Sequence, residues 1–347
     1  MSTPAYQPVF EATRGPIVES IHYGAFAVVD SRGQLLASHG DAEMVTYLRS
    51  SSKPFQALPF IEKGGADHFG LDEREVAILC ASHSGTDEHV AVVRGMQAKM
   101  SIPETALQCG SHTPGDSETA YQLRSRGEQP LPVRHMCSGK HSGMLGMARM
   151  SNLPLETYLS MDHPVQQAIL QALAEMSGVS STEIVIGTDG CSAPNFALPL
   201  QAAALAMARL CQPDGMPPAR AAACRRLVDA MRHEPGMIAG PGKFDTLLMR
   251  AAPSVVAKGG AEGYQILGVM PDAIEPGSPA LGIAMKISDG DAGDSRARQL
   301  VSVEILRQLG ALNAAEAAAL SKFSPRRIYN FARLDVGEYR AAFSIGK

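Results

Sequence analysis

The sequence predicts an α+β protein, an α/β sandwich in which an antiparallel sheet with flanking helices adjoins a helical block. β-Branched and aromatic residues gather near both ends of the chain, first in Ile17 to Asp30 and again in three short runs after residue 253, and this composition is typical of strands. Between them, apolar residues recur at helical spacing. One sheet results if the first and last β segments pair around an inserted helical part.

The elements follow in order along the chain. Ile17 to Asp30, a turn at Ser31-Arg32-Gly33 and Gln34 to Ser38 predict a β-hairpin. Helices are expected at Ser51 to Lys63, His89 to Met100, Ser117 to Arg126, Gly143 to Met150, Pro164 to Met176, Phe196 to Cys211 and Ala219 to Met231. The closing strands are Ser254 to Lys258, Tyr264 to Val269 and Leu281 to Ser288, and two helices follow, Ser295 to Leu309 and Ala314 to Lys322.

A chain of 347 residues suits one composite domain or two closely packed ones. We expect a single composite domain over residues 1–347. Its sheet part takes about 1–49 and 245–347, and its helical part about 50–244.

Bulk properties exclude several classes of protein. The net charge of −4 offers no electrostatic footprint for nucleic acid or an anionic membrane. No stretch reaches the roughly 18 apolar residues that span a bilayer, and Met1 to Phe10 does not have the pattern of a secretory signal. The six cysteines are sparse and irregularly spaced, as in a reduced cytoplasmic protein.

The first candidate for chemistry is the run Ser50-Ser51-Ser52-Lys53. On a helix, residues three apart share one face, so Ser50 and Lys53 come within hydrogen-bonding reach. A serine hydroxyl needs a base to become a nucleophile, and a buried lysine can serve if its charged form is disfavoured. The same spacing also occurs by chance, so this motif alone is weak.

Two further segments strengthen it. Ser82-His83-Ser84 ends a short apolar segment, Glu75 to Ala81, which we interpret as a strand leading into a loop, and Lys258-Gly259-Gly260 ends another strand. Serine hydrolases of the β-lactamase and penicillin-binding type carry Ser-x-x-Lys, a serine triplet and a Lys-Thr-Gly motif in this order. A second pair, Ser82 with Lys258, then joins the first. The alternative for the triplet is a turn that caps the next helix.

Two cysteines lie in segments rich in small polar residues, Cys137 to Gly143 and Thr188 to Cys191. Two thiolates from separate loops suit a borderline cation such as zinc. The third ligand is open between His135, Lys140, His141 and Asp189, and a lysine must lose its proton to bind. Two buried structural thiols, or a redox pair, remain alternatives.

Taken together, these segments resemble the class 3 L-asparaginases, also called the asparaginase II family. The resemblance runs over nearly the whole chain, and the cysteine segments are its most specific part. It rests on Arg49 to Gln56, Ala81 to Gly85, Cys137 to Gly143, Gly187 to Cys191 and Ala257 to Gly260.

The resemblance implies a fold similar to serine β-lactamases and glutaminases, a homodimer, and hydrolysis of L-asparagine to L-aspartate and ammonia. In that family's pattern, Ser50 is the nucleophile and Lys53 its base, and Ser82 and Lys258 form the second pair.

The same resemblance implies an auxiliary zinc ion on Cys137, Lys140 and Cys191, with water as fourth ligand and Asp189 nearby. We expect Arg49 or His141 to hold the substrate carboxylate. Two alternatives stay open: a penicillin-recognising serine hydrolase, esterase or other amidase, which leaves the cysteines unexplained, and a non-enzymatic binding protein on a degenerate hydrolase fold.

Overall fold

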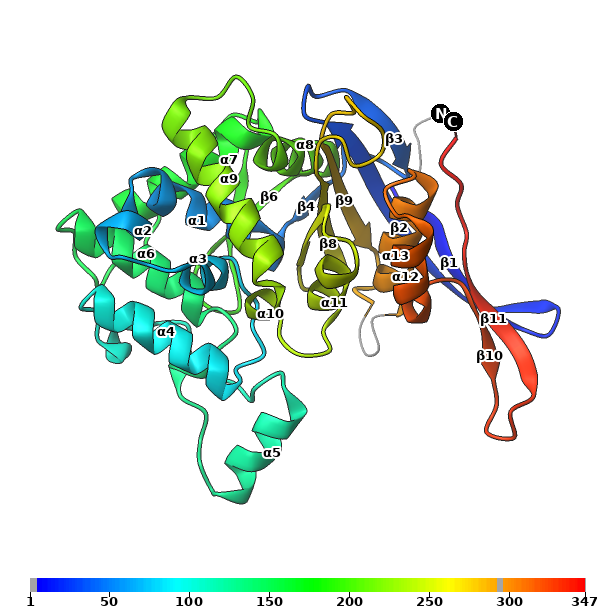
Figure 1. Cartoon of the computed structure of the whole chain (residues 1–347), viewed down its shortest axis with the longest axis horizontal. Coiled ribbons are helices and arrows are strands. Elements are labelled where there is room, and N and C mark those ends of the chain that lie inside the picture. The colour runs from blue at the N-terminus through cyan, green and yellow to red at the C-terminus, as the bar shows by residue number, and fades with distance from the viewer. Residues whose placement is uncertain (1–4, 292–295, 347) are drawn as a thin grey trace. The chain divides into compact units, whose positions relative to one another are not determined.

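The computed structural model describes residues 5–291 and 296–346 and has the predicted α+β class, with an antiparallel sheet and many helices (Figure 1). The chain divides into two compact units, which are described separately. Unit 1 takes residues 1–51, 198–212 and 251–347, and unit 2 takes residues 52–197 and 213–250. That the chain forms one composite domain stays a prediction.

Unit 1 is built on an antiparallel sheet with the strand order β10-β11-β1-β2-β9-β8-β7. In addition, β3 pairs with residues Phe26 to Val29 of β2. Its strands are β1 (Gln7–Arg14), β2 (Ile17–Asp30), β3 (Leu35–His39), β7 (Val255–Gly259), β8 (Tyr264–Val269), β9 (Leu281–Ile287), β10 (Arg326–Tyr329) and β11 (Asp335–Ala341); the short strand β4 (Val45–Tyr47) also belongs to this unit. The pairing of β2 with β9, in which Val28 lies opposite Ile283, confirms that the first and last β segments share one sheet.

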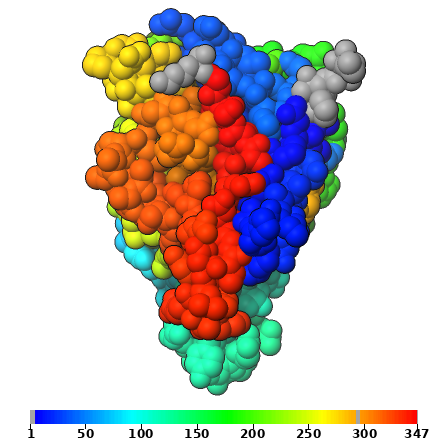
Figure 2. Space-filling view, turned by 90° about the vertical axis from the view of Figure 1, so that its right-hand side faces the viewer, coloured from blue at the N-terminus to red at the C-terminus, as the bar shows by residue number. Residues whose placement is uncertain are grey.

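Three strands of this sheet were not predicted from the sequence: β1, β10 and β11. β1 pairs with β11, with Phe10 opposite Ala341, so the two ends of the chain lie side by side, as the blue and red surfaces in Figure 2 show. β10 and β11 form a hairpin next to the β1–β2 hairpin. Their side chains are mostly exposed or half-buried, so they lack the continuous apolar run that marked β8 and β9.

Helices cover both faces of the sheet in unit 1. α8 (Leu200–Cys211) packs against β2, β8 and β9, and α12 (Arg296–Gln308) packs against β1, β9 and β11. Ser302 of α12 reaches Met285 of β9, which shows the face that this helix covers. Among its described residues this unit also contains α13 (Ala314–Ala319), the 3-10 turn η4 (Ser321–Phe323) and most of the 3-10 turn η1 (Arg49–Ser52).

Unit 2 is mainly helical. Its helices are α1 (Lys53–Glu62), α2 (Gly65–His68), α3 (Glu73–Leu79), α4 (Asp87–Lys99), α5 (Ser117–Ser125), α6 (Ser138–Met150), α7 (Pro164–Ser177), α9 (Pro218–His233), α10 (Pro235–Ile238) and α11 (Phe244–Ala251), whose last residue belongs to unit 1. The 3-10 turns are η2 (Glu104–Ala106) and η3 (Pro132–Arg134). β5 (Val185–Thr188) pairs with β6 (Pro194–Pro199), with Ile186 opposite Phe196.

Helix α1 is the centre of unit 2. It packs against α6, α7 and α9, and every residue from Lys53 to Ile61 is buried. A helix buried on all sides is apolar around its whole circumference, which makes the two polar side chains on it, Lys53 and Gln56, exceptional. Polar side chains at such depth require hydrogen-bond partners.

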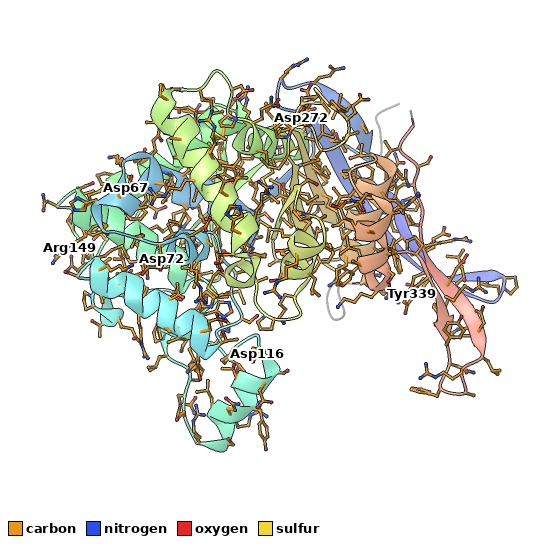
Figure 3. All side chains as sticks on the ribbon, in the orientation of Figure 1. Asp67, Asp72, Asp116, Arg149, Asp272 and Tyr339 are labelled. Carbon is orange, nitrogen blue, oxygen red and sulfur yellow. The ribbon has the colours of Figure 1, made fainter. Side chains whose placement is uncertain are left out.

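Side-chain caps fix where the surrounding helices begin. Asp72 forms a capping box with Glu75 at the start of α3, and Asp116 accepts a hydrogen bond from the Thr119 N–H at the start of α5 (Figure 3). Each cap satisfies a backbone donor that the helix leaves unpaired. α5 stands apart from the other helices of its unit in Figure 1.

Two expectations need correction, and a third falls partly outside the described residues. The apolar segment Glu75 to Ala81 is not a strand, because the capping box at Asp72 starts a helix there and α3 ends at Leu79. The helix expected at Phe196 to Cys211 begins only at Leu200, because Pro194–Pro199 forms the strand β6. Helix α12 begins at Arg296 among the described residues, and its expected first residue, Ser295, lies outside them.

Candidate active site

Lys53 is the most constrained residue of the candidate site. It starts α1, is 1% exposed, and its Nζ donates to three acceptors: Ala81 O at 2.6 Å, Ser82 Oγ at 2.9 Å and Met136 O at 3.3 Å. The carbonyls of Ala81 and Met136 can only accept, so both must receive N–H groups. The remaining direction on Nζ points at Ser82 Oγ. When Lys53 is charged, the third N–H of its ammonium group points at Ser82 Oγ. When Lys53 is neutral, the lone pair of the amine points there instead, so a proton can pass between Lys53 and Ser82.

The three consecutive serines differ in what their hydroxyls can do. They lie in the 3-10 turn η1 (Arg49–Ser52), which leads directly into α1. Ser51 is fully buried and its Oγ donates to Lys258 O at 2.8 Å, so this hydroxyl has a structural role. Ser52 is buried as well, whereas Ser50 is half-buried. Exposure therefore favours Ser50 as the hydroxyl that a substrate can reach, in agreement with its spacing from Lys53.

The Lys258-Gly259-Gly260 segment of unit 1 lies against the Leu48–Ser51 stretch. A Cβ on Gly260 would meet Leu48 O at 2.7 Å and Ser51 Oγ at 3.1 Å, so this approach requires glycine. Lys258 is fully buried, and its Nζ donates to Gly259 O at 2.7 Å. Arg49, expected to hold the substrate carboxylate, lies with its Nη1 3.9 Å from Glu262 Oε1.

In unit 2, Cys137 and Cys191 are buried free thiols that come together with Lys140. A hydrogen bond from Cys191 holds the pKa of Cys137 well below its usual range, with Lys53 and Lys140 adding to the shift against burial. The same hydrogen bond, with burial, raises the pKa of Cys191. The hydrogen bond between the two sulfurs therefore shifts their pKa values in opposite directions.

Lys140 lies against this sulfur pair. Its Nζ donates to Cys191 Sγ at 3.1 Å. Burial works against the ammonium, but the charge on Cys137 and Cys191 outweighs it, so the pKa of Lys140 is raised. The interaction between Lys140 and the two sulfurs thus offsets part of the cost of burying these polar groups.

The donor set nevertheless fits a zinc ion. Within residues 5–291 and 296–346, no three His, Cys, Asp or Glu side chains gather closely enough to hold a metal, so a site on Cys137 and Cys191 needs a donor of another type. Lys140, in contact with Cys191, is such a donor once it loses its proton. Two thiolates and an amine are ligands that zinc accepts.

The two remaining predicted residues lie close to the cysteines. His141 is fully buried, and its Nδ1 is 2.6 Å from Tyr158 Oη, while its Nε2 finds no hydrogen-bond partner among the described residues. Burial lowers the pKa of His141 to about 4, so at neutral pH it can offer a substrate a hydrogen bond but no charge. Asp189 is half-buried, with its Oδ2 3.9 Å from Cys191 Sγ.

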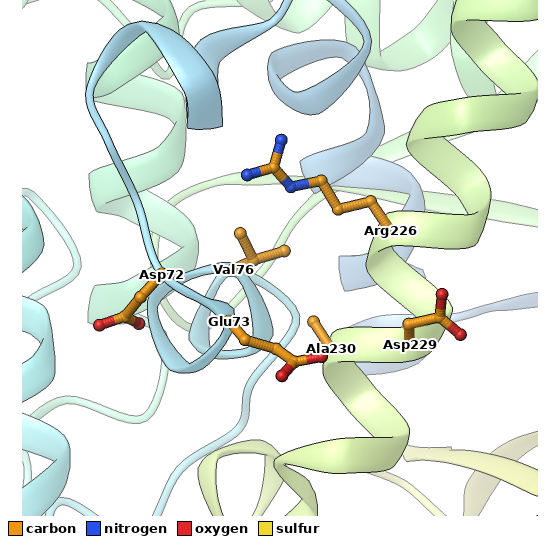
Figure 4. A pocket seen from close by; sticks show the side chains of 6 residues that line it. All are labelled: Asp72, Glu73, Val76, Arg226, Asp229 and Ala230. Carbon is orange, nitrogen blue, oxygen red and sulfur yellow. The ribbon is translucent and has the colours of Figure 1, made fainter.

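Sequence reasoning missed the acceptors that hold Lys53. Ala81 O and Met136 O are backbone atoms, which leave no signal in residue types. His83 stood inside a motif whose hydroxyls and imidazole were considered only as donors to a substrate. A surface hollow of about 390 Å³ in unit 2, lined by Asp72, Glu73, Val76, Arg226, Asp229 and Ala230, contains none of the predicted site residues (Figure 4).

Comparison with known proteins supplies the family. The model of the L-asparaginase II family matches residues 10–341, so the chain belongs to this family. It is therefore an amidohydrolase that acts on a small-molecule substrate. A search of the curated proteins finds no match. Among the residues that the structure describes, no helix has the length and apolar character needed to cross a membrane.

Several solved structures are similar to this chain at low sequence identity. One described as Mglu in its native form is 15% identical, with 84% of this chain and 66% of that chain covered and a TM-score of 0.44. A probable glutaminase from Bacillus subtilis complexed with 6-diazo-5-oxo-L-norleucine is 14% identical, with 82% of each chain covered and a TM-score of 0.36. A β-lactamase from Burkholderia ambifaria is 16% identical, covering 87% of this chain and 93% of that chain, with a TM-score of 0.38.

Proposed function

We propose that the protein is an L-asparaginase that hydrolyses L-asparagine to L-aspartate and ammonia through a serine–lysine acyl-enzyme mechanism. Membership of the L-asparaginase II family supports the reaction class. The observation that carries the mechanism is the bonding of Lys53, whose two carbonyl partners leave one direction on Nζ for proton exchange, and that direction points at Ser82 Oγ.

In this mechanism, Ser50 Oγ attacks the side-chain amide carbon of asparagine, and Lys53 Nζ takes up the hydroxyl proton through Ser82 Oγ, the group on its one open direction. The C–N bond then breaks, the proton is delivered to the departing ammonia, and a β-aspartyl ester remains on Ser50. Water attacks this ester, gives a proton back to the serine oxygen and releases aspartate.

The second pair, Ser82 and Lys258, relays protons to the leaving amine and helps to activate the water. Ser82 also forms a hydrogen bond with Lys53, the proposed base. It therefore interacts directly with Lys53, in addition to its proposed pairing with Lys258. Arg49 holds the substrate carboxylate by charge, and His141 and Asp189 contribute hydrogen bonds to the substrate.

A zinc ion held by Cys137, Lys140 and Cys191 would supply an auxiliary positive centre for substrate binding. The protein's own contribution is a buried sulfur pair in which the pKa of Cys137 is held well below its usual range, chiefly by the hydrogen bond from Cys191. We also propose a homodimer in the cytoplasm, on the strength of the family resemblance; light scattering of the purified protein tests the oligomeric state.

The test is ammonia release from L-asparagine and from L-glutamine by purified protein, with Ser50→Ala and Ser51→Ala as a matched pair. We expect turnover of asparagine, its loss in Ser50→Ala, and its retention in a folded Ser51→Ala. Near-normal turnover by Ser50→Ala would refute the assignment of the nucleophile. Acylation by a labelled β-lactam, without release of ammonia, would favour the penicillin-recognising alternative.

A further inference from the structure

His83, between Ser82 and Ser84, has both ring nitrogens engaged in the interior of unit 2. Its Nδ1 accepts a hydrogen bond from the Gly85 N–H at 3.1 Å, and its Nε2 is 2.9 Å from Ser138 Oγ. Because Nδ1 is an acceptor, the proton of the neutral ring lies on Nε2 and is donated to Ser138. The Ser138 hydroxyl in turn donates a hydrogen bond to Val133 O at 2.7 Å. The direction of every bond in this chain is therefore set.

This chain joins two segments that also meet at Lys53. Of the three acceptors of Lys53 Nζ, Ala81 O and Ser82 Oγ precede His83, whereas Met136 O belongs to the segment that leads into Ser138. The bond from His83 to Ser138 thus connects the same two stretches of chain as Lys53 does. The length of the His83–Ser138 bond therefore constrains the distance between Met136 O and the other two acceptors of Lys53, Ala81 O and Ser82 Oγ.

We propose that His83 is a positioning residue for Lys53, acting through Ser138, and this rests on the proposed role of Lys53 as the base. With the bond in place, both carbonyls draw the N–H groups of Lys53 and direct the remaining position on Nζ at Ser82. Without it, the Met136 side can separate from the Ala81 side, and the amine loses its orientation.

Burial supports a role that needs a rigid, uncharged link. His83 is 2% exposed and Ser138 fully buried. Burial, together with electrostatic interactions with nearby His89 and Lys53, lowers the pKa of His83 well below its usual range. The ring therefore stays neutral, and Nδ1 stays an acceptor, throughout the range in which amide hydrolysis would be assayed.

The experiment compares Ser138→Ala, His83→Leu and His83→Gln in the full-length protein, with steady-state ammonia release from L-asparagine. Misplacement by about 1 Å can reduce the rate roughly 100-fold, so we expect kcat to fall on the order of 10- to 100-fold in Ser138→Ala and His83→Leu, with KM little changed. His83→Gln keeps an N–H donor near the position of Nε2 and should restore most of kcat. The double variant Ser138→Ala/His83→Leu should be no slower than the slower of the two single variants, because each single substitution already removes the same His83–Ser138 hydrogen bond.

His163 provides a matched control in the same unit. It is 5% exposed, its Nδ1 accepts from the Val165 N–H at 3.2 Å, and its Nε2 is 3.1 Å from Pro154 O. His163→Leu removes the same kinds of bonds, so it should lower the urea unfolding midpoint as His83→Leu does while kcat stays near that of the unaltered protein. Equal losses of kcat in the two histidine variants, or a normal kcat in folded Ser138→Ala and His83→Leu, would overturn the inference. Absence of amide turnover in the unaltered protein would instead refute the proposed function.

Discussion

Gly139, in the first turn of α6, tests how closely the segment with the proposed metal ligands must pack. A Cβ at this position would lie 2.2 Å from Ile78 O and 2.9 Å from Ile78 C. Both are backbone atoms at the end of α3, so neither can rotate away. Since ordinary contact begins at 3.4 Å, Gly139→Ala must push α6 and α3 apart by roughly 1 Å.

The cost can be worked from this displacement. Overpacking of a filled interior costs about 1–3 kcal/mol, and replacing glycine by alanine within a helix returns at most about 1 kcal/mol. We therefore expect a net loss of roughly 1–2 kcal/mol in the free energy of unfolding. Because α6 carries Lys140 and follows Cys137 directly, a shift of about 1 Å should also reduce kcat/KM by up to about 100-fold and weaken zinc binding.

Gly143→Ala on the same helix is the control. Its Cβ would meet Leu79 Cδ2 at 2.8 Å, the end of a side chain that can change rotamer. This variant should keep or slightly raise stability, because the gain in helix propensity is opposed only by a small repacking. Urea unfolding, ammonia release and zinc competition with a chelator measure the three effects. If both variants unfold at the same urea concentration and bind zinc equally, the backbone contact at Ile78 does not constrain α6 and the reasoning is wrong.

Three further outcomes follow. Lys53→Met should lower kcat by about 10²- to 10⁴-fold, the usual contribution of a general base, and unchanged turnover in the ammonia assay would count against that role. The Cys191→Ser variant should bind no zinc, and its KM should rise by a larger factor than its kcat falls. Metal analysis and steady-state kinetics measure these two effects. The free energy of unfolding should fall as the pH drops below about 6.5, because the lowered pKa values of His83 and His141 leave the unfolded state with more bound protons. Each contributes up to about 1.4 kcal/mol per pH unit, and equal urea stability at pH 7 and pH 5 would contradict it.

Strands with an unbroken apolar pattern were predictable from the sequence, and strands without one were not. β2 and β8 have the bounds that their composition predicts, because both carry long runs of buried apolar residues. β1, β10 and β11 are mixed in character, and they become strands through pairing with one another and with β2. Their conformation depends on neighbours that are remote in sequence, so local propensity carries little information about it.

α3 was misread for a different reason. Its short apolar stretch looks like a buried strand, yet Asp72 and Glu75 before and within it have the spacing of a capping box. That signal was present in the sequence and, read first, distinguishes a helix start from a strand.

The sequence by itself determined the family and the residue types of the candidate site: the serines and lysines of both proposed pairs, and the two cysteines with Lys140. Only the tertiary structure decided how Lys53 is bonded, which of the consecutive serines is tied to Lys258 O, and that His83 connects to Ser138. The physical reason is that the decisive acceptors, Ala81 O and Met136 O, are backbone atoms brought to Lys53 from 28 and 83 residues away. Every residue has such a carbonyl, so its use as a partner is decided by packing and leaves no trace in residue type.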